Sequence, residues 1–291
     1  MHESGTHSSI KTVALVGVGL IGGSLAAALK SRGADAPTII GVGRNGQRLE
    51  QACQANLLDR STTDLTQAAG EADLIVFCTP VDLIVDGVRQ AAPHCRPGTL
   101  ITDAGSVKGE ICTALADPLA EGVAFIGSHP LAGSHRRGFE HADPQLFEGR
   151  VCVVTPGPSA VAAEVRRLTE FWQSVGMNVL EMPPEAHDSV VAQTSHLPHL
   201  VACALVASLD GQNQPLAATG FQDTTRVAAG DPDVWLPIVL QNAEEILRSL
   251  DLFGEQLSAF KQAVKDRNPQ ALRALLQTAK NQRDQLDSRS S

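Results

Sequence analysis

The sequence has no run of basic residues, and this absence excludes a broad class of partners. Its 291 residues include 23 Lys and Arg against 32 Asp and Glu, which gives a formal net charge of −9 at pH 7. A nucleic-acid-binding surface needs clustered positive charge to neutralise phosphates. We therefore expect no nucleic-acid partner.

Cysteine pairs at metal-binding or redox spacing are missing as well. The six cysteines are scattered along the chain, and none forms a CxxC pair. Such a distribution is typical of reduced cysteines in a cytosolic protein, and it disfavours disulfides and a metal site. We predict a cytoplasmic protein without a bound metal.

Long apolar runs are the third absence. We expect no membrane span and no membrane partner, because no apolar stretch approaches the required length and no basic segment with an apolar core opens the chain. The composition, with 43% apolar and 19% charged residues, is typical of a globular protein. The length suffices for about two domains.

The first stretch with a clear signature is Val13–Ser24, which reads VALVGVGLIGGS. Apolar residues lead into spaced glycines and then into an alanine- and leucine-rich segment, the order of strand, glycine turn and helix. In a dinucleotide-binding fold, Gly17 permits the tight turn, Gly19 lets a pyrophosphate approach the backbone, and Gly22 lets the helix pack close to the strand. The helix N-terminus offers free N–H groups to the phosphates. We predict cofactor contacts from Gly17, Gly19, Leu20, Ile21 and Gly22.

The end of the second expected strand, Thr38–Val42, bears on the choice of cofactor. In this fold an acid at that place binds the 2′-hydroxyl of NAD, whereas an Arg accommodates the 2′-phosphate of NADP. Here the strand runs into Gly43-Arg44-Asn45 without an acid, and Arg44, with Arg48 nearby, could hold a phosphate. We favour NADP, with NAD as the alternative and a solvated Arg44 as the simpler interpretation.

Strands and helices alternate as far as Pro183. This alternation predicts a mainly parallel, doubly wound sheet of the Rossmann type, an α/β fold. Further strands are expected at Leu74–Thr79, Leu100–Asp103, Val123–Gly127, Val151–Thr155 and Asn178–Met182. Helices are expected at Arg48–Ala55, Asp82–Ala92, Gly109–Leu119 and Val161–Val175.

After Pro183 the strand pattern disappears. Long helices are expected at Ala186–Leu209, Pro232–Leu250, Leu252–Val264 and Pro269–Leu286. A small all-helical half rich in Leu, Val and Ala must bury its apolar faces, so we expect a homodimer formed through it. We predict a dinucleotide-binding domain over residues 1–183 and an all-α substrate and dimerisation domain over residues 184–291.

Polar residues at the ends of the expected strands are the first candidates for chemistry, because ligands of an open parallel sheet bind beyond the carboxyl ends of its strands. Thr79-Pro80 and Ser106 follow two strands, and His129 directly follows a third. A neutral imidazole near a nicotinamide can take an alcohol proton while hydride leaves. The alternative is that His129 is a buried, hydrogen-bonded histidine.

The helical half offers further candidates. Ser195 and His199 are four residues apart and share a helix face, and Pro198 is expected to bend that helix. Arg226 stands alone in an apolar stretch, which suits bidentate capture of a carboxylate. The alternative for Arg226 is a salt bridge to Asp223 or Asp231.

Seven motifs occur in order along the chain: GVGLIGGS, VFCTP, TDAGSVK, GSHPLAGS, the HD of Glu185–Asp188, SHLPH and GFQDTTRVA…DPDVW. Together they closely resemble the prephenate/arogenate dehydrogenase family of tyrosine biosynthesis, from about Lys11 to Trp235. The pair SHPLAGS and SHLPH is far more specific than the glycine turn alone.

The resemblance implies an activity on a small molecule. Hydride passes from C4 of a cyclohexadiene to NAD or NADP, and carbon dioxide leaves from C1. Prephenate then gives 4-hydroxyphenylpyruvate, and arogenate gives tyrosine. Arg44 resembles the arogenate-type, NADP-using members, whereas donors such as His196 favour prephenate, so the choice of substrate stays open.

The resemblance also implies roles for site residues. His129 matches the general base at the C4 hydroxyl, Ser106 matches a serine near the nicotinamide and the hydroxyl, and Arg226 matches the arginine that binds the ring carboxylate. Further pocket contacts are implied for Ser195, His199, Ser134 and His187. Ser134 stands where many relatives carry Thr.

Two other functions are the alternatives. A β-hydroxyacid dehydrogenase would share the two-part plan, but it would be expected to use a lysine in its helical half, and Ala186–Leu209 and Pro232–Leu250 contain none. A non-catalytic nucleotide sensor would keep the glycine turn without needing His129, Ser106 and Arg226 together.

Overall fold

The structure, a computed structural model, describes residues 10–133 and 136–287. The chain divides into two compact units, Met1–Ala243 and Glu244–Ser291. The predicted domain boundary near Pro183 does not coincide with the boundary between these two units, and it stays a prediction. Ser134 lies outside the described residues, so its expected place in the pocket is not addressed below.

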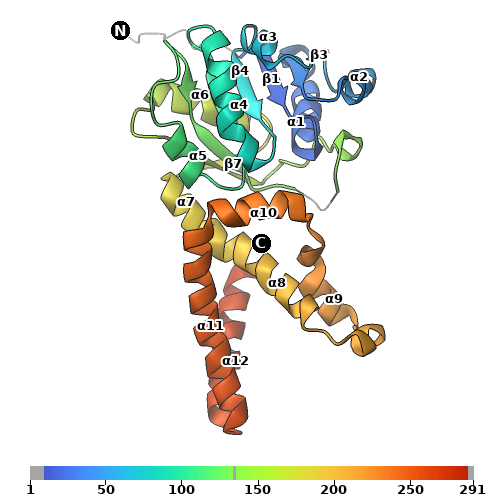
Figure 1. Ribbon diagram of the computed structural model, residues 1–291, viewed down its shortest axis with the longest axis vertical. Helices are drawn as coiled ribbons and strands as arrows, with labels where there is room; N and C mark the ends of the chain where they lie inside the picture. Colours follow the sequence, from blue (N-terminus) through green and yellow to red (C-terminus); the bar gives the residue numbers. More distant parts are fainter. Residues whose placement is uncertain (1–9, 134–135, 288–291) are drawn as a thin grey trace. The chain divides into compact units, whose positions relative to one another are not determined.

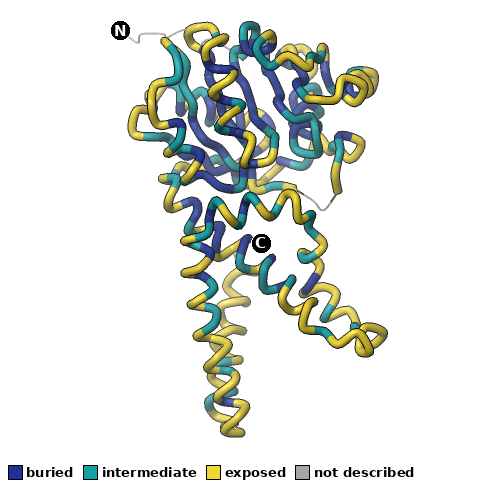
Figure 2. Tube along the Cα trace, viewed as in Figure 1, coloured by how far each residue is buried: buried dark blue, intermediate teal, exposed yellow. Residues whose placement is uncertain are grey.

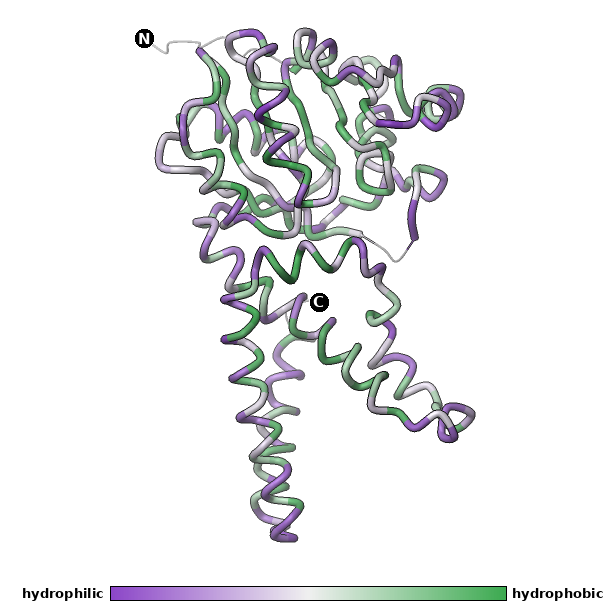
Figure 3. Tube along the Cα trace, viewed as in Figure 1, coloured by the Kyte–Doolittle hydropathy of each residue, from purple (hydrophilic) through white to green (hydrophobic). Residues whose placement is uncertain are grey.

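A six-stranded sheet with all neighbours parallel forms the centre of the first unit (Figure 1). Its two central strands are continuous apolar runs that are almost completely buried, as expected for parallel strands covered on both faces. They are dark blue in Figure 2 and largely green in Figure 3. In spatial order the strands are β3 (Arg60–Thr62), β2 (Thr38–Val42), β1 (Thr12–Val16), β4 (Leu74–Phe77), β5 (Leu100–Asp103) and β6 (Ala124–Phe125).

Helices cover both faces of this sheet, which confirms the doubly wound α/β fold. Successive residues of β1 point to opposite faces: Leu15 joins an apolar cluster with α1 and α6, and Val16 joins one with α4 and α5. The helices of this part are α1 (Leu20–Lys30), α2 (Gly46–Gln54), α3 (Leu65–Ala69), α4 (Ile84–Ala91), α5 (Gly109–Ala114) and α6 (Ala162–Gln173), with short 3₁₀ turns η1 (Gly33–Asp35), η2 (Val81–Leu83), η3 (Ala92–His94) and η4 (Phe139–His141).

A separate three-stranded sheet corrects one detail of the prediction. The expected strand Val123–Gly127 is two strands, because the chain leaves the parallel sheet after β6 and enters β7 (Gly127–Pro130). β7 pairs antiparallel with β8 (Val151–Thr155), which pairs parallel with β9 (Asn178–Glu181). The switch occurs where Ser128 donates its backbone N–H to a side-chain oxygen of Asp103 (3.1 Å) instead of to a neighbouring strand.

Several boundaries also differ from the prediction. The expected helix Gly109–Leu119 ends at Ala114, ahead of Pro118, which cannot continue a helix. The break expected near Leu250 lies instead at Asn242, whose backbone leaves the helical region and whose side chain is buried. The short strand β3 was not predicted.

The remaining part of the first unit is helical. The expected helix Ala186–Leu209 is one continuous run with a π-helical turn in it, and Pro198 occupies an early position of the segment after that turn. The elements are α7 (Pro184–Val191), the π-helical turn η5 (Ala192–His196), α8 (Leu197–Ala207), η6 (Gly211–Leu216), α9 (Thr219–Thr225), η7 (Arg226–Ala229) and α10 (Pro232–Gln241).

By length and composition alone, the run Pro184–Ala207 could cross a membrane, so the expectation that no stretch is long enough is wrong on that count. The core helices of soluble proteins and signal sequences meet the same length and composition criteria. This run also carries several ionisable side chains, and burying such groups in the hydrocarbon of a membrane costs free energy. Two of them, His187 and Asp188, are buried and hydrogen-bonded within the protein.

The second unit consists of α11 (Ala243–Lys265), which begins at the boundary, and α12 (Pro269–Asp287). The turn between them has Arg267 at a positive φ of 51°, and the Asn268 side chain accepts hydrogen bonds from the first backbone N–H groups of α12. Large apolar side chains of this unit are more than half exposed: Leu247, Leu252, Leu257, Val264, Leu276 and Leu286.

Candidate active site

A cavity of about 730 Å³ lies within the first unit, at the carboxyl ends of the parallel strands. This is the size of a small-molecule site. Its walls come from the glycine turn after β1, the loops after β4 and β5, the end of β7, and the helical segments η5, η7 and α10. Nine of the predicted site residues line it: Gly19, Leu20, Ile21, Thr79, Pro80, Ser106, His129, Ser195 and Arg226.

The glycine turn has the shape that a dinucleotide needs. Gly17 has φ +96°, and a Cβ on Gly22 would lie 2.2 Å from the carbonyl oxygen of Gly17, so both positions require glycine. A Cβ on Gly19 would meet nothing within 4 Å, which leaves open space beside the backbone. No side chain caps α1 and no acid lies in its first turn, so its N-terminal N–H groups fit a pyrophosphate.

Thr79 supplies a second sign of a ligand at this end of the cavity. Its hydroxyl oxygen is buried and has no hydrogen-bond partner in the described part of the chain. A buried hydroxyl without a partner is uncommon in a folded protein. Together with the glycine turn, this orphaned hydroxyl fits the binding of a nicotinamide dinucleotide.

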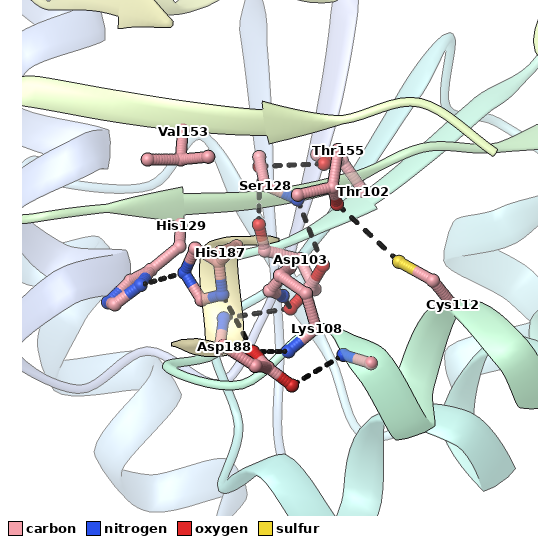
Figure 4. Close-up of polar contacts among 12 residues, drawn as sticks. Thr102, Asp103, Lys108, Cys112, Ser128, His129, Val153, Thr155, His187 and Asp188 are labelled. Atoms are coloured by element: carbon pink, nitrogen blue, oxygen red, sulfur yellow. Dashed lines mark hydrogen bonds and ion pairs between the residues drawn. The ribbon is translucent and has the colours of Figure 1, made fainter. Parts of the chain in front are cut away.

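His129 begins a row of three hydrogen-bonded side chains, seen in Figure 4. Its Nδ1 lies 2.8 Å from Nε2 of His187, and Nδ1 of His187 lies 2.7 Å from Oδ1 of Asp188. Asp188 also accepts the backbone N–H groups of Lys108 (2.8 Å) and Gly109 (2.7 Å) at the start of α5. The sequence indicated His129 but gave no sign that Asp188 lies behind it.

This row determines which ring nitrogens carry protons. Asp188 accepts hydrogen bonds from backbone N–H groups, so Nδ1 of His187 donates to it and Nε2 of a neutral His187 accepts. Nδ1 of His129 must then donate to His187. Nε2 of His129 is left as the hydrogen-bond acceptor, which is the nitrogen that a base needs.

The surroundings keep His129 uncharged. Burial lowers the pKa of His129 well below its usual 6.5, and the positive charges of His187, Lys108 and His196 would each act in the same direction. His129 is therefore neutral at neutral pH.

A fully buried ion pair anchors the loop beneath this row. Lys108 and Asp103 are both completely buried and form an ion pair. Asp103 also accepts the backbone N–H groups of Gly105 (2.8 Å) and Ser128 (3.1 Å). The loop that carries Ser106 and the strand that carries His129 are thus tied to the same carboxylate.

The structure does not place His187 or His199 on the wall of the cavity. His187 is completely buried behind His129, and neither it nor His199 lines the cavity. The ring of His199 stacks on the indole of Trp235, with centroids 3.6 Å apart and planes 5° apart, and Trp235 does line the cavity. The π-helical turn leaves Ser195 exposed on the cavity wall while His199 is buried, so the two do not present one common polar face.

Arg226 stands at the start of η7 with an exposed side chain on the cavity wall. Of its two alternative partners, Asp231 pairs with Arg137, and no ion pair joins Arg226 to Asp223 among the residues that the structure describes. Asp231 also caps α10 by accepting the N–H of Asp233 (2.8 Å). Arg226 is therefore available for an anionic group in the cavity.

Two arginines follow β2: Arg44 lies in the loop after the strand, and Arg48 lies in α2. Arg48 pairs with Glu140 at 2.8 Å and lies over the ring of Phe139. Arg44 is exposed, and no hydrogen bond or ion pair ties its side chain down in the described chain. Arg44 is thus the residue of this pair that can turn to a phosphate.

A doubly wound sheet with a glycine cradle and a neutral imidazole at the strand ends defines a nicotinamide-dependent oxidoreductase. Two family models match the chain: "Prephenate dehydrogenase, nucleotide-binding domain" over residues 25–181 and "Prephenate dehydrogenase, dimerization domain" over residues 183–278. The chain belongs to the prephenate dehydrogenase family.

Individual relatives agree with this assignment. Cyclohexadienyl dehydrogenase of Zymomonas mobilis is 34% identical over 87% of this chain and 88% of its own length. Prephenate dehydrogenase from A. aeolicus, solved with hydroxyphenyl propionate and NAD+, superposes with a TM-score of 0.89 at 30% identity, covering 96% of this chain and 99% of its own. Synechocystis arogenate dehydrogenase gives a TM-score of 0.81 at 33% identity, covering 94% and 99%.

Proposed function

We propose that this chain catalyses the oxidative decarboxylation of prephenate or arogenate, with NADP as its preferred cofactor. The observation that carries the proposal is the neutral His129, held by His187 and Asp188 on the wall of a cavity that also contains the glycine cradle and Arg226. The alternative of a β-hydroxyacid dehydrogenase is not favoured, given the family to which the chain belongs.

His129 acts on the ring hydroxyl of the substrate. Its Nε2 accepts a hydrogen bond from the C4 hydroxyl, which raises the electron density on that oxygen and favours loss of hydride from C4. An oxidised nicotinamide, held at the glycine turn and Thr79, would supply the hydride acceptor. We assign to Ser106, on the tethered loop beside His129, a hydrogen bond that orients the same hydroxyl.

The reaction releases no net proton, so a base that only forms a hydrogen bond to the C4 hydroxyl is sufficient for it. The C1–carboxylate bond breaks and its electron pair forms a double bond from C1 to C2. The C2–C3 double bond shifts to C3–C4, the other ring double bond stays in place, and the C4–H bond breaks as hydrogen leaves with its electron pair. The product is a phenol that retains the hydroxyl proton. A proton that His129 withdraws during the step therefore returns to the same oxygen, and none has to leave the site.

The other predicted contacts are proposed as binding groups. Arg226 binds the ring carboxylate through paired hydrogen bonds. Ser195 contacts the substrate side chain directly, whereas His199 supports Trp235 from behind, and His187 acts through His129. Gly17, Gly19, Leu20, Ile21, Gly22, Thr79 and Pro80 hold the dinucleotide.

A product assay tests the proposed reaction. Incubation with prephenate or arogenate should give one carbon dioxide and one reduced nicotinamide for each 4-hydroxyphenylpyruvate or tyrosine formed. Reduction of the nicotinamide without release of carbon dioxide would show simple alcohol oxidation and would contradict the proposal.

Substitution of Arg44 tests the cofactor preference. Arg44→Gln removes the charge that we assign to the 2′-phosphate, so KM for NADP should rise about tenfold while KM for NAD changes less than twofold. Arg48→Gln is the matched control, because Arg48 is already paired with Glu140. An equal change for both cofactors in Arg44→Gln would remove Arg44 from the cofactor site.

The pH profile tests the state of His129. Because the pKa of His129 lies well below 6.5, its neutral form persists as the pH falls through 6.5. We expect kcat/KM, which reports the free enzyme, to stay level from about pH 7 to about pH 6 and to fall only at lower pH. Thermal melts in the same buffers separate loss of activity from loss of fold, since a buried neutral histidine also lowers stability in acid. A decline centred at pH 6.5 or above would contradict the assignment.

We also propose a cytoplasmic homodimer formed through the helical half. The match to a dimerisation domain supports dimer formation. Leu247, Leu252, Leu257 and Val264 of α11 are exposed large apolar side chains, and a second copy would cover side chains of this kind. All six cysteines are free, in keeping with the expectation of reduced thiols.

A further inference from the structure

His196 is a buried histidine of the cavity wall that the proposed reaction does not use. Its side chain is 1% exposed, yet it lines the same cavity as His129, Arg226 and Trp235. Its ring stands edge to face with the indole of Trp235, with centroids 6.0 Å apart. Its Nε2 has no hydrogen-bond partner among the residues that the structure describes. A buried nitrogen of this kind requires an explanation.

Asn242 determines the orientation of the hydrogen bonds at His196. The Asn242 side-chain nitrogen lies 2.9 Å from the backbone carbonyl oxygen of Asp188 and 3.1 Å from Nδ1 of His196. The carbonyl oxygen can only accept, so it must face the NH₂ group of Asn242, and the flipped amide would place two oxygens against each other. The second N–H of the same NH₂ group then points at Nδ1 of His196.

The tautomer of His196 follows from this contact. Because Nδ1 accepts a hydrogen bond from Asn242, it carries no proton, and the single proton of the neutral ring is on Nε2. Protonation of Nδ1 would place two donors against each other. In agreement, the pKa of His196 is lowered to about 4, chiefly by burial, with the charges of His187 and His199 adding to the shift and that of Asp188 opposing it. Nε2–H is thus a donor at every physiological pH.

We propose that His196 is a substrate-binding residue whose Nε2–H donates a hydrogen bond to an oxygen of the substrate. This inference rests on the proposed function and adds a recognition element to it. The donor suits the keto oxygen of a pyruvyl side chain or an oxygen of the ring carboxylate. It cannot pair with an ammonium group, which also only donates. Where His196 meets the side chain, the site therefore favours the keto acid over the amino acid.

Two substitutions separate this role from a structural one. In His196→Asn, the amide oxygen occupies roughly the place of Nδ1, so it can still accept from Asn242, but the Nε2–H donor is gone. In His196→Gln, the longer amide can place an N–H near the position of Nε2, so the donor is retained while the Asn242 contact is lost. A structural role predicts that Asn is the milder change, and a substrate-binding role predicts the reverse.

We expect His196→Asn to raise KM by about 10–100-fold, the loss of one buried hydrogen bond, with kcat, cofactor binding and thermal stability changed little. His196→Gln should recover at least part of this loss. If the acceptor is the keto oxygen, the increase appears with prephenate and not with arogenate. If it is the ring carboxylate, both substrates are affected equally. A KM for His196→Asn within twofold of the wild type with both substrates would overturn the proposal, as would a larger loss for Gln than for Asn.

Nitrogen-15 NMR of histidine-labelled wild-type protein supplies a test that needs no variant. We expect the proton of His196 on Nε2, and we expect the Nε2 resonance to shift when prephenate, which carries both candidate acceptors, is added to protein without the cofactor. A proton on Nδ1, or an Nε2 resonance that does not respond to bound ligand, would overturn the proposal. Wild-type protein that is inactive with prephenate and arogenate would instead reject the proposed function, so the two failures are distinguishable.

Discussion

His129→Asn is expected to reduce turnover by about a hundredfold to ten-thousandfold, the usual contribution of a positioned base. The asparagine side chain can place its amide N–H near the position of Nδ1, so the hydrogen bond to His187 can persist. Nothing then occupies the position of Nε2, and the C4 hydroxyl of the substrate loses its acceptor. The measurement is kcat with saturating substrate, together with the Kd of the cofactor, which should stay within twofold of the wild type.

His94→Asn is the matched control for this variant, because His94 lies exposed in η3, outside the residues of the cavity wall. It should leave kcat unchanged. Turnover of His129→Asn within a few fold of the wild type would reject His129 as the base. Loss of cofactor binding in the same variant would show that the imidazole contributes to the fold of the site instead.

Arg226→Gln is expected to have its main effect on substrate binding. A carboxylate in the cavity would lose its charged, paired partner, which typically costs about 2–4 kcal/mol, so KM should rise about 30–1000-fold while kcat falls much less. Arg226→Lys keeps the charge but loses the planar pair of N–H donors, and we expect it to recover only part of the affinity.

Arg248→Gln is a suitable control, since Arg248 lies in the second unit and pairs with Glu244 and Glu245 of its own helix. Its KM should match that of the wild type. A normal KM in Arg226→Gln would remove Arg226 from the pocket, and a large loss of kcat alone would assign it to the chemical step.

The sequence predicted the fold well where the signal is local. The glycine turn, the buried strands β1, β4 and β5, and the alternation with helices follow from residue types and spacing over a few positions. The rule that ligands bind beyond the carboxyl ends of parallel strands correctly predicted that Thr79 and Ser106 line one cavity. His129 lines the same cavity, but from β7 of the second sheet and not from the end of a parallel strand.

The contacts that were not predicted are long-range ones between side chains. His187 and Asp188 lie 58 and 59 residues after His129, and only the packing of α7 against α5 and β8 places them behind its ring. At the transition from β6 to β7, the side chain of Asp103 accepts a hydrogen bond from the backbone N–H of Ser128, which lies 25 residues later in the chain. No periodicity in the sequence reports such contacts.

Asn242 illustrates the same limit in the helical half. The apolar pattern continues across it, so the sequence favours one long helix. In the structure its backbone leaves the helical region, and its amide is buried between Asp188 and His196. The break in the helix and the fixed tautomer of His196 thus involve the same residue.

The most direct test of the proposed function is an initial-rate assay with four combinations, prephenate or arogenate with NAD or NADP, that follows the reduced nicotinamide. We predict activity in at least one combination, with NADP preferred over NAD because Arg44 replaces an acid at the end of β2. Preference for NAD would contradict the assignment of Arg44 alone. Absence of activity in all four combinations, by protein that still binds the cofactor, would contradict the proposed function.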